Sequence, residues 1–356
     1  MTAPLLQDTG FREATIWATP IRDLGLTIEG TQLEPIVAEF RRELEAVGFR
    51  RLSPRYYLST EWGVPFETVA IAIPFYRAHP ELQEMHAERT GHVEGRDREE
   101  ILRYLRHEMG HVVNYAYRLY DDAEWEALFG SMSEPYEDDY RPVPFSRKHV
   151  RHLPGWYAQK HPDEDWSETF AVFITPGLDW RAEYAARPEA LAKLEYCERT
   201  VAALLDREPV VVDDELDEDV GELEYSLAQF YRDLAAADAR LGLNLDTMLR
   251  SVFPATGARA GTTPHVAAAE LLRRLEGELL GNVYRWTGHF PERTRVLVHH
   301  LRARAQSLEL CYRTEEEPAV TVALTTLVTS LAMNYVQSGG YLGEDDIVRI
   351  EDDFAR

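Results

Sequence analysis

The chain has 356 residues, of which 45% are hydrophobic and 11% aromatic, enough apolar side chain for one large or two ordinary domains. Its 62 acidic and 38 basic residues give a formal charge of -24, which repels nucleic-acid phosphates and anionic lipid headgroups. We therefore expect neither nucleic acid nor a membrane surface as a partner.

The cysteines and the N-terminal sequence indicate the compartment. Cys197 and Cys311 lie in apolar, helix-like stretches, which favours a reducing environment over a disulfide framework. The first residues lack the basic segment and the continuous apolar run of a signal peptide, and no stretch approaches 18 apolar residues. We expect a cytoplasmic protein, and the oligomeric state is left open.

The N-terminal part predicts one helix and then a small sheet. Residues 33–47 carry apolar side chains at helical spacing until Gly48 ends the pattern. Residues 55–59 and 68–73 have the composition of strands, and the second stretch ends at Pro74, as edge strands do.

Three further helices are predicted before residue 210. Asp97 followed by Glu100 has the pattern of a capping box, which begins a helix running through residues 101–120. Residues 131–162 are rich in Pro, Tyr, Ser and charge, too long for a plain connector and typical of a functional loop. Helical periodicity resumes over residues 163–174 and 187–205.

An acidic segment divides the sequence. Between residues 213 and 224 there are eight acidic residues and no basic one, which indicates a solvated linker. We therefore predict domains over residues 1–210 and 225–356, joined by an acidic linker over 211–224. Helices predicted over 223–241, 265–283, 294–312 and 319–336 make the second domain helical, and the whole chain α+β but mainly helical.

The sequence HEMGH, residues 107–111, carries the chemistry. It fits H-E-x-x-H on a helix, where His107 and His111 lie about one turn apart and can bind one zinc ion. Glu108 lies about 100° around the helix, where its carboxylate can take a proton from zinc-bound water without binding the metal. From composition alone, the five letters arise by chance in roughly one such chain in twenty-five, and the alternative is two solvated histidines.

A catalytic zinc ion needs a third protein ligand, which we expect in the segment EDWSETFAVF, residues 164–173. Glu168 is the preferred candidate, because it lies within a helix-like stretch that has an apolar side. A buried acidic residue there costs free energy unless it has a partner such as a metal ion. Glu164, Asp165 and the loop histidines compete with Glu168. For Glu164 and Asp165 we favour stabilisation of a helix N-terminus, although Asp165 could also orient a histidine ligand.

The segments LRHEMGH, HPDEDWSETFAVF and RPEALAKLEYCE together resemble zinc-binding metallopeptidases of bacteria that are related to the gluzincins, over residues 50–205. The resemblance implies that Glu168 completes the metal site and that a Tyr or His shortly before it steadies the oxyanion. Tyr157 and His161 occupy that neighbourhood. The chain departs from some relatives in lacking zinc-ribbon cysteines, and its helical extension after residue 215 has no identified counterpart.

These observations predict a zincin-like metallopeptidase domain with a small edge sheet, followed by a C-terminal helical domain. It would hold one Zn²⁺ per chain through His107, His111 and Glu168, and cleave peptide or protein substrates with Glu108 as general base. Two alternatives stay open: a zinc-stabilised binding or regulatory protein without catalysis, and a zinc amidohydrolase that acts on a small amide or isopeptide conjugate.

Overall fold

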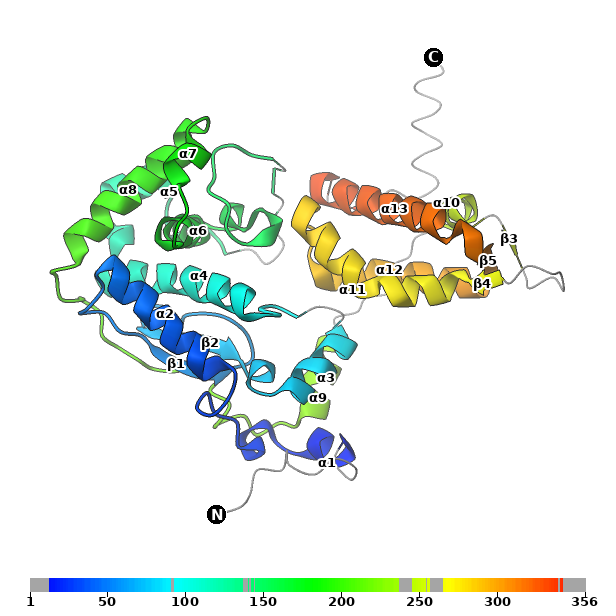
Figure 1. The fold of residues 1–356 in the computed structure, drawn as a ribbon, viewed down its shortest axis with the longest axis horizontal. Helices are drawn as coiled ribbons and strands as arrows, with labels where there is room; N and C mark the ends of the chain where they lie inside the picture. Colours follow the sequence, from blue (N-terminus) through cyan, green and yellow to red (C-terminus); the bar gives the residue numbers. More distant parts are fainter. Residues whose placement is uncertain are drawn as a thin grey trace. The chain divides into compact units, whose positions relative to one another are not determined.

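A computed structural model describes residues 13–90, 93–136, 140, 142–143, 145–236, 245–253, 255–256, 265–338 and 340–341. It is mainly helical and contains two compact units (Figure 1). Unit 1 comprises residues 1–89, 93–140 and 145–235, and unit 2 comprises the remainder.

Unit 1 contains the helices that carry the sequence motif and the smaller sheet. Its helices are α1 (Glu13–Ala18), α2 (Leu33–Val47), α3 (Pro80–Thr90), α4 (Arg98–Tyr117), α5 (Ala123–Phe129), α6 (Pro162–Ile174), α7 (Trp180–Tyr184), α8 (Pro188–Leu204) and α9 (Leu227–Ala236). Short 3-10 turns are η2 (Ile21–Leu24), η3 (Phe75–Ala78), η4 (Leu119–Asp121) and η5 (Pro154–Gln159).

Helix α4 begins where the sequence predicts. Asp97 is the N-cap, and its side chain accepts hydrogen bonds from the backbone N–H groups of Glu99 and Glu100. The helix ends at Arg118, which adopts the left-handed conformation with φ 48°. From Leu105 onwards almost every side chain of α4 except Arg106 is buried, so the HEMGH segment lies within the core of unit 1.

Helices α4 and α6 lie side by side in the centre of unit 1 (Figure 1). Gly110 makes this close packing possible, because a Cβ there would stand 2.6 Å from the Cα of Ser167. The indole Nε1–H of Trp166 donates to the Gly110 carbonyl at 2.8 Å. Pro162 is the first residue of α6, a position whose N–H would have no acceptor within the helix, so the missing N–H of proline costs nothing there.

The smaller sheet pairs β1 (Arg55–Ser59) in parallel with β2 (Ala70–Pro74). All five residues of β2 are buried. On the side of β2 away from β1, the N–H of Ala72 donates to the Gly63 carbonyl at 2.8 Å. The second strand is therefore not the open edge that the sequence suggested.

The acidic segment differs from the linker expected over residues 211–224. The N–H of Val69 donates to the Asp213 carbonyl at 2.6 Å, and the N–H of Val220 donates to the Leu58 carbonyl at 3.0 Å. The Tyr57 hydroxyl donates to the Asp217 carbonyl at 3.1 Å. Its acidic side chains face solvent while its backbone bonds to the sheet, so this segment belongs to unit 1, which continues to residue 235.

Unit 2 adds strands that the sequence did not predict. Its elements are α10 (Asp246–Val252), β3 (Ala255–Thr256), β4 (His265–Ala267), α11 (Ala268–Thr287), α12 (Pro291–Ser307), β5 (Leu310–Arg313), η6 (Thr314–Glu316) and α13 (Glu317–Ser338). The strands form an antiparallel sheet in the order β3-β5-β4. Residues 265–267 and 310–312 were expected to be helical, but short apolar runs fit either structure.

Among the residues that the structure describes, one helix, Thr314–Ser338, is long and apolar enough by length and composition to cross a membrane, although the sequence analysis expected no such segment. A third of its most apolar window is buried, and Leu324, Val328 and Leu331 belong to the hydrophobic core of unit 2.

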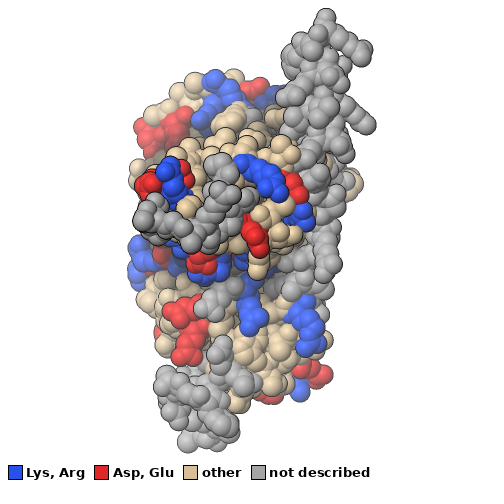
Figure 2. Space-filling model, turned by 90° about the vertical axis from the view of Figure 1, so that its right-hand side faces the viewer, with Lys and Arg blue, Asp and Glu red and all other residues tan. Residues whose placement is uncertain are grey.

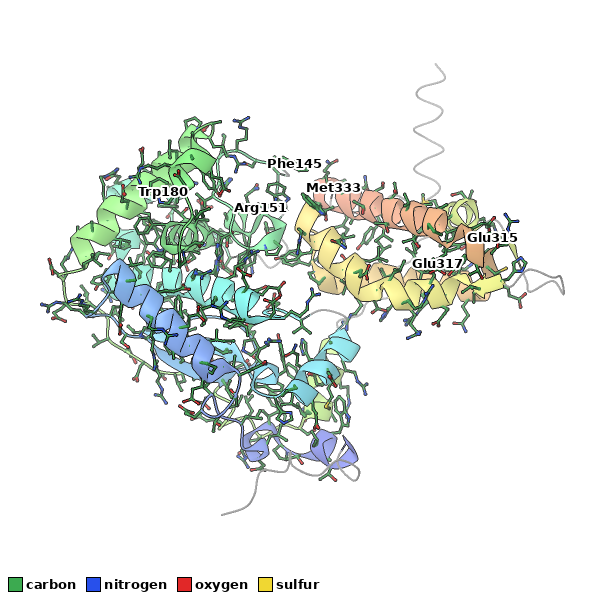
Figure 3. All side chains as sticks on the ribbon, in the orientation of Figure 1. Phe145, Arg151, Trp180, Glu315, Glu317 and Met333 are labelled. Atoms are coloured by element: carbon green, nitrogen blue, oxygen red, sulfur yellow. The ribbon has the colours of Figure 1, made fainter. Side chains whose placement is uncertain are left out.

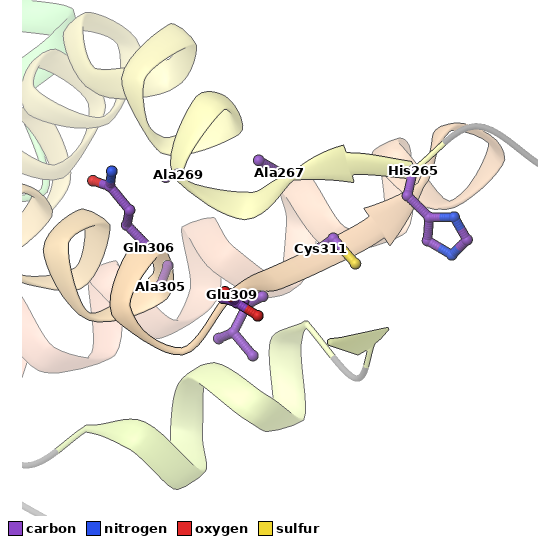
Figure 4. A pocket seen from close by; sticks show the side chains of 8 residues that line it. His265, Ala267, Ala269, Ala305, Gln306, Glu309 and Cys311 are labelled. Carbon is purple, nitrogen blue, oxygen red and sulfur yellow. The ribbon is translucent and has the colours of Figure 1, made fainter. Parts of the chain in front are cut away.

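Two surface features complete the description. On the face shown in Figure 2, acidic and basic side chains are interspersed, and neither sign gathers into one patch. Unit 2 holds a cavity of about 380 Å³ whose polar lining includes His265, Glu309 and Cys311 (Figure 4). None of the residues that the sequence assigned to catalysis lines it.

Candidate metal centre

Two imidazoles and one carboxylate come together between α4 and α6. His107 Nε2 lies 3.3 Å from His111 Nε2 and 2.9 Å from Glu164 Oε2, and His111 Nε2 lies 3.3 Å from the same oxygen. All three residues are buried. In the part of the chain that the structure describes, this is the group whose spacing could hold a metal ion.

The spacing and chemistry of these atoms fit zinc. Ligands about 2.0–2.1 Å from a tetrahedral zinc ion lie about 3.3–3.4 Å from one another. The three distances here, 2.9 to 3.3 Å, match or fall slightly below that value. Two imidazoles with one carboxylate also form a donor set that catalytic zinc uses, with a fourth position open.

Glu168 does not join this group, although the sequence analysis preferred it as the third ligand. It lies one turn further along α6, and its Oε1 contacts His107 on the other ring nitrogen, Nδ1, at 3.0 Å. Its Oε2 accepts hydrogen bonds from the backbone N–H groups of His152 at 2.6 Å and Leu153 at 2.8 Å. Glu168 thus fixes the orientation of the His107 ring and ties the preceding loop to α6.

Glu108 is buried next to the cluster but is not one of its three close atoms. Its side chain is 4% exposed, and it makes no hydrogen bond to any residue that the structure describes. Burial raises the pKa of Glu108 to about 7, against the opposing effect of His107 and His111. A carboxylate with a pKa near neutrality is suited to accept and return a proton.

The two candidates for the oxyanion donor have different positions. His161 caps α6: its Nδ1 accepts from the Asp163 N–H at 3.2 Å, and its Nε2 lies 3.0 Å from the Glu134 carbonyl. Both of its ring nitrogens are therefore engaged in structural hydrogen bonds. The Tyr157 ring, in contrast, packs edge-on against His107 with ring centres 5.5 Å apart.

Part of this chain resembles a described family. Residues 81–239 match the family described as "putative zinc-binding metallo-peptidase". The match confirms the family resemblance that the sequence motifs indicated. It starts later than the resemblance over residues 50–205 and extends through the acidic segment. No curated protein and no solved structure showed a significant match to the chain.

Within the segment that matches this family, His111 has an acidic partner that the sequence analysis did not identify. Asp163 Oδ2 lies 2.8 Å from His111 Nδ1, and the carboxylate also accepts from Asn114 Nδ2 at 2.6 Å and from the Tyr115 hydroxyl. Each histidine of the pair thus contacts a separate carboxylate through Nδ1, which directs Nε2 toward the shared centre.

Tyr136 is a second residue of the matched segment that the sequence analysis missed. Its hydroxyl donates to Glu164 Oε1, the oxygen that does not face the histidines. The sequence signal was the length and composition of the 131–162 loop, which indicated function but singled out no residue before Tyr157.

The charges of the cluster balance one another. Burial disfavours the charged imidazole of His107, but its hydrogen bonds to the accepting carboxylates of Glu164 and Glu168 outweigh that effect and raise its pKa to about 9. Burial acts in the same way on His111, and Asp163 and Glu164 raise its pKa well above the usual value. Burial would raise the pKa of Glu164, yet the two histidines hold it well below its usual range. Positive charge is therefore strongly favoured at this centre, which suits a divalent cation.

Proposed function

We propose that the chain is a zinc-dependent peptidase whose metal is held by His107, His111 and Glu164. Glu164 replaces Glu168 in this proposal because Glu164 Oε2 is the carboxylate oxygen close to both Nε2 atoms. Glu168 and Asp163 would orient the two rings through Nδ1. A bound zinc ion supplies Lewis-acid activation of water and of a carbonyl group.

Glu108 is the residue that makes the site catalytic in this proposal. The supporting observation is a buried carboxylate beside the cluster, without a hydrogen bond to the described residues and with a pKa raised to about 7 by burial. A structural zinc site has no need of such a group, since its four positions are filled by ligands. Glu108 would take a proton from the attacking water and return it to the departing amine.

The loop before α6 supplies the other polar groups. Tyr157 is our choice for the oxyanion donor, because its ring lies against His107, one of the proposed ligands. Tyr136 would hold Glu164 Oε1, so that the carboxylate presents only Oε2 to the metal. Peptide or protein substrates and a cytoplasmic location stay predictions.

The test is Glu108→Gln with zinc supplied to the full chain. Zinc content, measured by atomic absorption, should equal that of the wild type, and cleavage of a mixed peptide library should disappear. A wild-type protein that binds zinc and cleaves no peptide would support the non-catalytic alternative. An unchanged cleavage rate in the variant would overturn the assignment of Glu108.

A further inference from the structure

The loop over residues 145–160 lies directly against the proposed metal centre. Its backbone bonds to Glu168 through His152 and Leu153, and its Tyr157 ring packs on His107. Figure 3 shows Phe145 and Arg151 on this loop. Any peptide bound at the cluster would therefore meet side chains of this loop.

The charge of this loop is opposite to that of the whole chain. It contains Arg147, Lys148, Arg151 and Lys160 and no acidic residue, in a chain with 62 acidic residues and a formal charge of -24. The chain has only three lysines, and two of them lie here. Arg147 and Lys148 are exposed, and Arg151 and Lys160 are partly buried. The loop is therefore a basic segment of an acidic chain, and its Arg and Lys side chains can attract anionic groups.

Two aromatic residues of the loop adopt backbone conformations that bulky side chains rarely take. Phe145 has φ 61° and Trp156 has φ 62°, and their ring centres lie 5.1 Å apart. Phe145 is 65% exposed, a large apolar side chain left on the surface. Strain of this kind costs about 1–3 kcal/mol per residue and is concentrated at binding and catalytic sites.

Trp156 of this pair lies against the positive charge of Arg151 and also carries a buried hydrogen-bond donor. The Arg151 guanidinium carbon lies 4.1 Å from the centre of the Trp156 ring. The indole Nε1–H of Trp156 is buried and has no acceptor among the residues that the structure describes. A buried donor without an acceptor costs free energy, and a carboxylate would supply the acceptor.

Lys160 places a further positive charge beside the tyrosines of the site. Its Nζ lies 4.2 Å from the Tyr136 ring centre and 5.5 Å from the Tyr157 ring centre. Tyr136 bonds to Glu164 and Tyr157 packs on His107, so the ammonium group stands one side chain away from the cluster.

We propose that the 145–160 loop is the substrate-recognition surface and that it selects peptides carrying a carboxylate near the scissile bond. Arg151 and Lys160 bind the carboxylate, and Phe145 with Trp156 packs against the adjacent apolar part of the peptide. The carboxylate is either an Asp or Glu side chain or the C-terminus of the substrate. This inference rests on the proposed peptidase function.

The test measures binding separately from cleavage. The zinc-loaded Glu108→Gln chain is titrated into three fluorescent peptides of the same length: one with internal Glu and blocked ends, one with Gln in place of Glu and blocked ends, and one with Gln and a free C-terminal carboxylate. At least one carboxylate peptide should bind about tenfold more tightly than the blocked Gln peptide, as expected for a charge-assisted hydrogen bond. Which one does so identifies the source of the carboxylate.

Matched variants show which residues cause the preference for carboxylate peptides. In the Glu108→Gln background, Arg151→Gln or Lys160→Gln should remove most of the tenfold preference. Arg199→Gln, which removes an exposed arginine paired with Glu124, should leave it unchanged. Equal affinity for all three peptides, or a preference that survives both loop variants, would overturn the inference.

Failure of the two proposals gives different results. A wild-type chain that cleaves the three peptides at equal rates, with equal affinities in the Glu108→Gln chain, retains the peptidase function and overturns carboxylate recognition. A chain that prefers the carboxylate peptides but cleaves none of them supports recognition and overturns the peptidase function.

Discussion

Gly110 is the position where one methyl group should alter both stability and metal binding. It lies between the two histidines of HEMGH and faces Ser167 of α6. In Gly110→Ala the new Cβ would stand 2.6 Å from the Ser167 Cα, whereas ordinary contact begins at 3.4 Å, so the helices must separate by 0.8 Å (3.4 − 2.6). The contacting atom is backbone, which no side-chain rotation relieves.

The magnitude follows from two opposing effects. Overpacking a dense core costs about 1–3 kcal/mol, and alanine regains about 0.5–1 kcal/mol through its higher helix propensity. We expect net destabilisation of about 1–2 kcal/mol. The cluster loses its geometry as well, because His107 and His111 lie on α4 while Glu164 lies on α6, and zinc affinity should fall by about tenfold or more.

The assay combines thermal unfolding of the apoprotein with a competitive zinc titration against a chromophoric chelator. Gly281→Ala is the matched control: this glycine lies inside α11, where an added Cβ meets nothing within 4 Å, so the same substitution should be neutral or stabilising. The close approach of α4 and α6 would be refuted if Gly110→Ala kept both the wild-type melting temperature and the wild-type zinc affinity.

Two further predictions concern acidic and titrating groups of unit 1. Glu164→Gln should reduce zinc affinity more than Glu168→Gln, for which a loss of about 10–100-fold is expected of a ring-orienting residue. The reverse order in a zinc titration would restore Glu168 as the ligand. Burial, with help from Lys193 and Lys148, lowers the pKa of His149 from 6.5 to about 4. The unfolded chain therefore binds this proton at a higher pH than the folded chain, so the associated stability is present above pH 6.5 and lost as the pH falls toward 4, with an upper limit of about 3 kcal/mol. In His149→Gln the denaturation midpoint should change less with pH over that window than in the wild type. Plots of the midpoint against pH that run parallel for the variant and the wild type would contradict this.

The sequence determined the features that depend on local spacing. The four-residue separation of His107 and His111 places two imidazoles on one helix face, and Asp97 sets the start of that helix through its own hydrogen bonds. The same local logic located α6 and its acidic first turn. It also led to the family resemblance that the match over residues 81–239 confirms, because the motif and the downstream acidic helix occur together in one chain.

Tertiary structure decided which carboxylate lies beside which histidine nitrogen. Glu164 and Glu168 are one turn apart on α6, so both face α4, and helical periodicity treats them alike. Only the depth at which α6 packs on Gly110 determines that Glu164 meets the Nε2 atoms while Glu168 meets Nδ1 of His107. The acidic segment shows the same limit: its charge predicts solvent exposure, but backbone hydrogen bonds to the sheet, which composition does not encode, place it within unit 1.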